Sequence, residues 1–194
     1  AGNIIEDGIF YNNNDMTPTD IQNFLSSKVP NCDTNGSQMY SGSQTRAQYG
    51  ASRGYPAPYV CLKDYVENGL NSAQIIKNAS NAYQVNPKVL LVLLQKEQTL
   101  VTDDWPWSSQ YRSATGYGCP DTAACDSQYY GFTNQVNNAA RQFRLYANNP
   151  SSYRYKPYQS NYIQYNPNAD CGGTNVNIEN KATAGLYNYT PYQP

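Results

Sequence analysis

The most hydrophobic segment of the chain is "VNPKVLLVLLQKEQTLV", residues 85–101. Asn86 followed by Pro87 is a typical helix start, because an Asn side chain caps the first turn and Pro needs no hydrogen-bond partner there. Leucines at positions 90, 93 and 94 then fall on one face of the helix. Glu97 falls on the same face. The pattern therefore predicts a buried helix that carries a carboxylate in its apolar stripe.

The same kind of pattern predicts further helices at 17–29, 61–68, 72–83, 133–146 and 179–187. The first begins with Thr17 as N-cap and Pro18 in the first turn. The helix at 72–83 is separated from the hydrophobic helix by a few residues only, so the two should form a helical hairpin. The inward-facing residues of the helix at 72–83 are predicted to be Ile75, Ile76, Ala79 and Ala82.

The remaining segments are rich in Gly, Pro, Asn and Tyr. We expect an extended N-terminal arm, a long loop at 31–58, and one pair of strands in "YIQY" and "TNVNI". The predicted fold is therefore mainly α, with a helical core, long disulfide-stapled loops and at most a small β-hairpin. Residues 1–70 should form an arm and a helix packed on a core of residues 71–194, in one compact domain.

The composition limits the classes of partner. The chain is 39% hydrophobic and 14% charged, with a net charge of −1, no His and 20 Tyr. Such a balance offers no electrostatic attraction for nucleic acid or an anionic membrane. The aliphatic run is interrupted at Gln95 and is therefore too short for a helix that inserts into a membrane. A surface of Tyr, Asn, Gln, Ser and Thr suits carbohydrate, although many extracellular proteins share it. We expect a monomer.

The five cysteines suggest an oxidising compartment. Cys119 and Cys125 enclose the short loop "CPDTAAC" and should form a local disulfide, worth roughly 2–3 kcal/mol in the chain-entropy model. Cys32 and Cys61 are the second predicted pair, worth about 3–4 kcal/mol. Cys171 is left over and is expected to be free and buried.

Metal, cofactor and thiol chemistry have little support in the sequence. The chain has no His and no CxxC spacing, so we expect neither a metal site nor a cofactor. A cysteine nucleophile would lack a His base. The chain starts at Ala1 without a signal peptide, as a mature secreted protein would. We therefore expect a secreted protein that acts without a bound metal.

Glu97 is the candidate for acid–base chemistry. A carboxylate in apolar surroundings loses hydration, which favours its neutral form and raises its pKa, as a general acid near neutral pH requires. Two structural alternatives stay open. Glu97 can lie where the helix leaves the core, or it can pair with a neighbouring cation.

The segment "AYQVNPKVLLVLLQKEQTL" resembles the part of goose-type lysozymes and lytic transglycosylases in which a helix begins at a Pro and ends at the catalytic Glu. "YYGFTNQV" is similar to their Gly-Leu-Met-Gln motif and to a run in resuscitation-promoting factors, and "GLYNYTPYQP" to their Ala-Tyr-Asn-Ala-Gly motif. The chain also resembles secreted actinobacterial-type proteins labelled "hemagglutinin", in "LQKEQ", "ATGYGCPD" and "YTPYQP". It departs from the lysozyme-like pattern at Gln98, at the spacing of Gly131 and Gln135, and at Tyr189.

The resemblance covers roughly residues 72–192 and implies an α+β lysozyme-like fold. It implies a secreted enzyme at the bacterial cell wall that cleaves the β-1,4 bond between MurNAc and GlcNAc in peptidoglycan glycan strands. Glu97 would be the general acid. The residues implied to line the cleft are Tyr130, Gln135, Tyr187 and Tyr189.

Two points remain open at this stage. Trp105 and Trp107 in "DDWPW" are candidates for stacking on sugar rings, or for ordinary packing. Asp121, between Pro120 and the local disulfide, is the best candidate for a second carboxylate that positions water, with Asp103, Asp104 and Asp126 as alternatives. Its presence favours a hydrolase, whereas a lytic transglycosylase would need no such group. The competing class is a non-catalytic carbohydrate-binding or adhesin domain.

Overall fold

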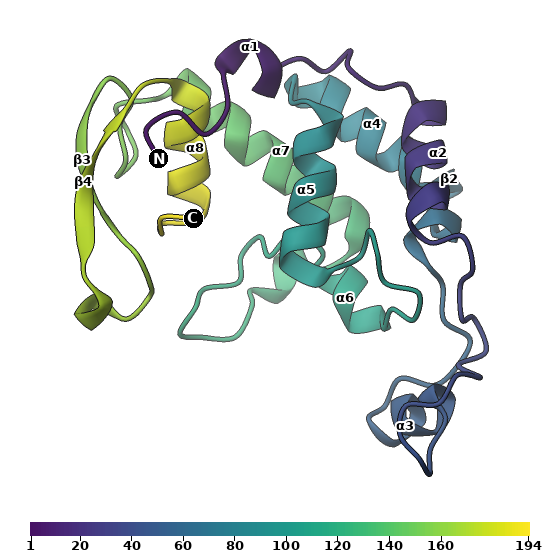
Figure 1. Ribbon diagram of the computed structural model, residues 1–194. Coiled ribbons are helices and arrows are strands. Elements are labelled where there is room, and N and C mark those ends of the chain that lie inside the picture. Colours follow the sequence, from purple (N-terminus) through teal and green to yellow (C-terminus); the bar gives the residue numbers. More distant parts are fainter.

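The computed structural model describes residues 1–194. Helix α5 (Pro87–Gln98) runs through the middle of the helical part of the molecule, with α4 (Ser72–Tyr83) and α7 (Phe132–Asn148) packed against it and against each other (Figure 1). Helix α2 (Pro18–Lys28) lies on α4. The two β-sheets are small antiparallel hairpins. The predicted mainly α fold with at most small hairpins is confirmed.

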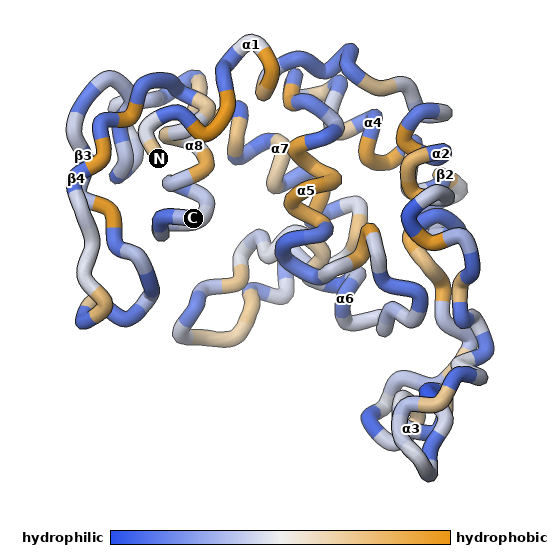
Figure 2. Tube along the Cα trace, in the orientation of Figure 1, coloured by the Kyte–Doolittle hydropathy of each residue, from blue (hydrophilic) through white to orange (hydrophobic).

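Helix α5 forms for the reasons its sequence suggests. The Asn86 side chain accepts a hydrogen bond from the backbone N–H of Lys88 at 2.9 Å, and Pro87 occupies the first helical position. The helix ends at Thr99, which adopts a left-handed conformation with φ 55°. Its leucines are buried, whereas Val92 is 66% exposed. Figure 2 shows the middle of α5 as hydrophobic and its C-terminal end as hydrophilic. One face of α5 is therefore anchored in the core and the opposite face is open.

The main core unites the helices around α5. It is formed by buried side chains from α2, α4, α5, α7 and the loops between them, such as Ile21, Leu25, Ile76, Leu90, Leu94 and Val136. Helix α2 begins with the predicted N-cap, because Thr17 and Asp20 form a reciprocal capping box. Three residues from the first seventy, Ile21, Leu25 and Leu62, are thus part of the same core as the helical hairpin.

A second layer covers one side of this core. Helix α8 (Lys181–Tyr189) packs on α7 and on the hairpin of β3 (Gln159–Gln164) and β4 (Gly173–Ile178). Ile163, Ile178 and Tyr187 form a separate small core between hairpin and helix. The predicted strand pair and the predicted last helix are both present. Helix α8 therefore joins the C-terminal hairpin to the helical core.

The segment between the first disulfide cysteines projects from the rest of the molecule (Figure 1). We call residues 32–61 the α3 lobe, after its helix α3 (Arg46–Ser52). The predicted disulfide Cys32–Cys61 closes its base. Arg46 forms ion pairs with Asp33 at 3.4 Å and with Asp104 at 2.8 Å, so the lobe is also tied to the loop after α5. The prediction of a long loop here missed α3.

Several local predictions were wrong. The expected helix at 61–68 is one 3-10 turn, Leu62–Asp64, followed by the hairpin of β1 (Val66–Glu67) and β2 (Leu70–Asn71). The turn Asn68–Gly69 has positive φ at both residues, which favours a tight hairpin. The N-terminal arm contains the short helix α1 (Asp7–Phe10). Ala82 and the free Cys171 are exposed rather than buried.

The loop between α5 and α7 is more ordered than its composition suggests. It contains helix α6 (Ser108–Arg112) and a 3-10 turn, Ser127–Tyr129. The predicted local disulfide Cys119–Cys125 lies between these two elements.

None of the helices is both long and apolar enough to span a bilayer.

Candidate active site around Glu97

Glu97 is the penultimate residue of α5. Its side chain is 29% exposed, so the carboxylate lies between the core and solvent. Burial raises the pKa of Glu97, the cation of Lys96 lowers it, and the negative charge of Asp121 raises it again. The Lys96 ammonium lies 3.7 Å from Glu97 Oε1. Both alternatives considered from the sequence therefore hold in part, since Glu97 has a cationic neighbour at the helix end and is still largely desolvated.

A glycine-containing loop covers the Glu97 carboxylate. We call Thr115–Gly118 the TGYG loop. Gly116 has φ +69°, and a Cβ placed on it would lie 2.7 Å from Glu97 Oε2. A glycine is required here for two independent reasons, the left-handed backbone and the close approach of the carboxylate. The loop thus brings backbone, rather than a side chain, against the candidate acid.

Gln135 of α7 holds the TGYG loop in place. Its side-chain oxygen accepts hydrogen bonds from the backbone N–H groups of Thr115 at 3.1 Å and Tyr117 at 3.2 Å. Its amide nitrogen donates to the carbonyl oxygens of Tyr117 at 2.9 Å and Tyr129 at 2.7 Å. Gln135 is fully buried. It therefore shapes the site through the loop and does not itself line a cleft, contrary to the role implied by the resemblance.

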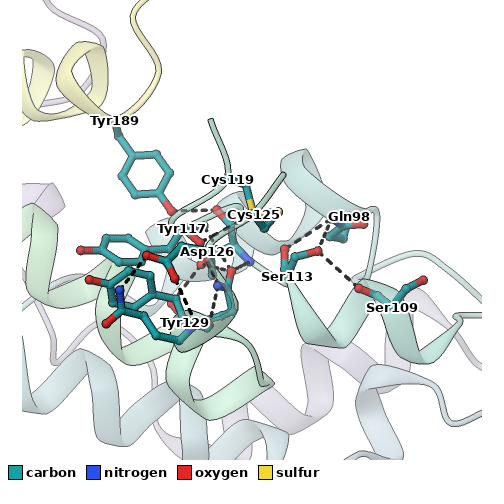
Figure 3. Close-up of a disulfide and its surroundings, with 12 residues drawn as sticks. Gln98, Ser109, Ser113, Tyr117, Cys119, Cys125, Asp126, Tyr129 and Tyr189 are labelled. Carbon is teal, nitrogen blue, oxygen red and sulfur yellow. Dashed lines mark hydrogen bonds between the residues drawn. A yellow bond between two sulfur atoms is a disulfide. The ribbon is translucent and has the colours of Figure 1, made fainter. Parts of the chain in front are cut away.

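Tyr189, at the end of α8, closes the other side of the site. Its hydroxyl donates to the carbonyl oxygen of Thr115 at 2.7 Å (Figure 3). Its ring stacks on Phe143 with 4.9 Å between centroids. Burial raises the pKa of Tyr189, the hydrogen bond to Thr115 lowers it, and the charge of Glu97 raises it further. Tyr189 is therefore near enough to Glu97 for the two groups to interact electrostatically. Tyr189, where the sequence departs from the lysozyme-like pattern, therefore forms one wall of the site.

Gln98 connects the helix end to α6. Its side-chain nitrogen donates to the carbonyl oxygen of Ser113 at 3.3 Å and to the Ser113 hydroxyl at 3.2 Å (Figure 3). The Gln110 amide in turn donates to the Gln98 carbonyl oxygen at 2.9 Å. Gln98 therefore fixes the start of the TGYG loop relative to α5, a structural reason for a Gln beside the candidate acid.

Asp121 lies on the loop closed by the local disulfide. It is exposed, and its Oδ2 accepts a hydrogen bond from the Tyr192 hydroxyl at 2.7 Å. This hydrogen bond raises the pKa of Tyr192. The loop is closed by the disulfide and by a 2.8 Å hydrogen bond from the Asp126 N–H to the Gly118 carbonyl oxygen. Asp121 is thus an exposed, restrained carboxylate whose charge raises the pKa of Glu97.

The two tryptophans lie outside this site. Trp105 packs among Tyr49 and Tyr59 and under Arg46, with 5.2 Å from its ring to the guanidinium carbon. Trp107 stacks on Tyr55 at 4.7 Å. Both indole N–H groups are buried without a hydrogen-bond partner. The tryptophans therefore attach the α3 lobe to the helical domain, which corresponds to the packing alternative.

Two predicted cleft residues also have structural contacts. Tyr187 is 1% exposed, and its hydroxyl donates to the carbonyl oxygen of Ala1 at 2.9 Å. The Tyr130 ring lies under the guanidinium of Arg112 at 5.1 Å.

Three residues of the site were not predicted from the sequence, namely Thr115, Gly116 and Thr190. The Thr190 hydroxyl accepts a hydrogen bond from Lys96 at 2.7 Å. The repeated glycines in "TGYG" were the available signal for a tight loop.

No three His, Cys, Asp or Glu side chains lie together as the ligands of a metal ion would. Glu97 is the one partly desolvated acid of this site.

Comparison with known proteins assigns the family. A family model described as "LasA, N-terminal domain" matches residues 3–177. The chain belongs to this family. No curated protein and no solved structure matches the chain. The part matched to the LasA N-terminal domain contains Glu97, the TGYG loop and Gln135, whereas Tyr189 lies beyond it. The family suggests a cell-wall-related protein, and the lysozyme-like resemblance stays a prediction.

Proposed function

We propose that this chain is a secreted enzyme that cleaves the β-1,4 glycosidic bond between MurNAc and GlcNAc in peptidoglycan, with Glu97 as the general acid. The observation that carries the proposal is the Glu97 carboxylate, partly buried at a helix end and covered by the backbone of Gly116. Membership of the LasA N-terminal domain family supports a cell-wall substrate.

The proposed chemistry begins with proton transfer. The carboxyl group of Glu97 donates its proton to the glycosidic oxygen as the bond to the sugar breaks and positive charge develops on the sugar ring. A raised pKa keeps a larger share of Glu97 protonated near neutral pH, where an ordinary Glu would be ionised. The helix and the TGYG loop hold the group rigidly, as acid catalysis requires.

Asp121 is the proposed second carboxylate. Its hydrogen bond to Tyr192 and the closed disulfide loop restrain it, and its side chain is exposed to solvent. In this role Asp121 would activate the water that attacks the sugar, which makes the enzyme a hydrolase. In the alternative transglycosylase reaction, the 6-hydroxyl of the sugar itself attacks and Glu97 serves as acid and then as base. Asp121 would then only tune the pKa of Glu97.

A non-catalytic sugar-binding role is the second candidate, favoured by the exposed face of the C-terminal hairpin. Tyr158 and Tyr162 are 66% and 54% exposed, and Asn175 pairs with Tyr162 across the two strands. Aromatic rings beside neutral amides suit carbohydrate. Such a surface can bind glycan strands whether or not Glu97 cleaves them.

An assay on purified peptidoglycan sacculi distinguishes the two candidates. The proposed enzyme clears a sacculus suspension and releases soluble sugar fragments. A binding module co-sediments with the sacculi and leaves turbidity unchanged. Co-sedimentation without clearing, for a folded protein across pH 4–8, would reject the proposed function.

A further inference from the structure

A large apolar groove lies beside the Glu97 site. We call it the α5–α8 groove, because it lies between the open face of α5, the N-terminal arm and α8. Its volume is about 590 Å³, and twelve of its eighteen lining residues are hydrophobic. Clefts of this size with a mostly hydrophobic lining are typical of binding sites for small molecules. Ile4, Ile9 and Val92 at its edges are 44%, 52% and 66% exposed, an unusual amount of open aliphatic surface.

The polar side chains that line the groove already have partners within the protein. The Asn86 amide donates to the Ile9 carbonyl oxygen and to Asp15, and the hydroxyls of Tyr187 and Tyr189 donate to backbone carbonyls outside the groove. The Gln193 amide donates to the Ile163 carbonyl oxygen. The groove therefore offers a ligand hydrocarbon walls and few free hydrogen-bonding groups. Its occupant should be a hydrocarbon chain.

One end of the groove meets the candidate acid. Lys96 and Thr190 line the groove, their side chains are hydrogen-bonded to each other at 2.7 Å, and the Lys96 ammonium lies 3.7 Å from Glu97 Oε1. Tyr192, which also lines the groove, donates to Asp121. A molecule that fills the groove would therefore have one end next to both proposed catalytic carboxylates.

From this continuity we infer that the α5–α8 groove binds an acyl or alkyl chain attached to the glycan substrate, next to the bond that Glu97 acts on. The inference rests on the proposed function for the sugar end of the ligand. The chain would lie along Val92 and Leu93 of α5 and Leu186 of α8, with the sugar at the Lys96 end. The substrate class is thus a glycan that carries a hydrophobic substituent.

Equilibrium binding of two probes tests this without any bond cleavage. Isothermal titration calorimetry compares hexyl and methyl β-N-acetylglucosaminide. The hexyl glycoside should bind at least about thirtyfold more tightly, which corresponds to half-burial of five methylene groups at up to about fourfold each. The Glu97→Gln variant should keep this preference, so a failed catalytic assignment and a failed groove assignment give different results.

A matched pair of variants locates the site. Val92→Glu places a charge on the groove edge at a position that is 66% exposed, and Val66→Glu does the same at 59% exposure on β1, outside the groove. Circular dichroism and thermal melts should show both variants folded. Val92→Glu should lose the hexyl preference and Val66→Glu should keep it. Equal affinity for the two glycosides, an unchanged preference in Val92→Glu, or binding of free hexanol as tight as that of the hexyl glycoside would each overturn the inference.

Discussion

The carboxylate of Glu97 and the backbone of Gly116 lie so close together that a single methyl group at Gly116 would come within 2.7 Å of Glu97 Oε2. Gly116 belongs to a loop that Gln135 holds from α7, and Glu97 ends a helix whose leucines form the main core. The environment of the candidate acid is therefore set by packing on one side and by a hydrogen-bonded loop on the other.

Replacement of Gly116 by Ala should reduce activity more than stability. The positive φ alone costs about 1–2 kcal/mol for a residue with a Cβ, equivalent to a few degrees in Tm. Gly54→Ala is the matched control, because Gly54 also has positive φ, +89°, but open space around it. Thermal melts should show at least the cost of the positive φ in both variants, whereas the sacculus-clearing rate should fall by at least about tenfold only in Gly116→Ala. Equal clearing rates in the two variants would contradict the role assigned to Gly116.

The Lys96→Met variant should shift the pH dependence of activity. The general acid must be protonated, so activity falls as pH rises through the pKa of Glu97. Lys96 lowers that pKa, and its removal should therefore move the alkaline limb of the kcat/KM profile to higher pH. Lys88→Met, two turns earlier on α5 and paired with Asp15, is the control. A limb that stays in place or moves to lower pH in Lys96→Met would contradict this electrostatic role.

The Glu97→Gln variant should be more stable than the wild type at neutral pH. Burial raises the folded-state pKa of Glu97 above its unfolded value of about 4.3. Between these two pKa values the native state binds more protons, so wild-type stability falls as pH rises through this window. Chemical denaturation at pH 3.5 and pH 7 should show a difference between the variants only at pH 7. Glu179→Gln, at an exposed position after β4, should show no such difference, and a destabilised Glu97→Gln at pH 7 would contradict the burial argument.

Gln135→Met tests the loop. The substitution keeps a similar volume but removes the hydrogen bonds to Thr115, Tyr117 and Tyr129, and leaves buried backbone groups without partners. Each such group costs about 1–3 kcal/mol, so Tm should fall by several degrees. The loss of clearing should exceed that of Asn137→Met on the same helix. Full activity in a folded Gln135→Met variant would show that the loop does not depend on this residue.

The helical framework was largely predictable from the sequence. Strong local signals, such as Asn86–Pro87 and the Thr17 capping box, mark helix starts, and the hydrophobic spacing in α5 identifies its buried face. The hairpin at Asn68–Gly69 carries an equally clear turn signal, but the residues before it also fit a short helix that ends at a glycine. The disulfide pairs could be predicted because the two cysteines of each pair enclose one segment of the chain with no other cysteine in it.

The composition of the site could be predicted only in part. Glu97 stood out because a carboxylate interrupts an apolar stripe. The role of Gln135 depends on tertiary contacts with a loop about twenty residues away, and no local pattern indicates whether such an amide faces solvent or the core. The tryptophans illustrate the same difficulty, since their packing partners Tyr49 and Tyr55 lie some fifty residues earlier in the chain.

The most direct test of the account is mass spectrometry of the soluble products released from purified sacculi by the wild type and by Glu97→Gln. We expect disaccharide-containing fragments with new reducing ends from the wild type, and a release rate lower by ~10²–10⁴-fold for Glu97→Gln, the usual contribution of a general acid. Fragments lighter by one water would indicate transglycosylation and remove the role of Asp121 as a base. Glycan fragments released by Glu97→Gln at the wild-type rate, or no cleaved glycan from either protein, would contradict the central claim.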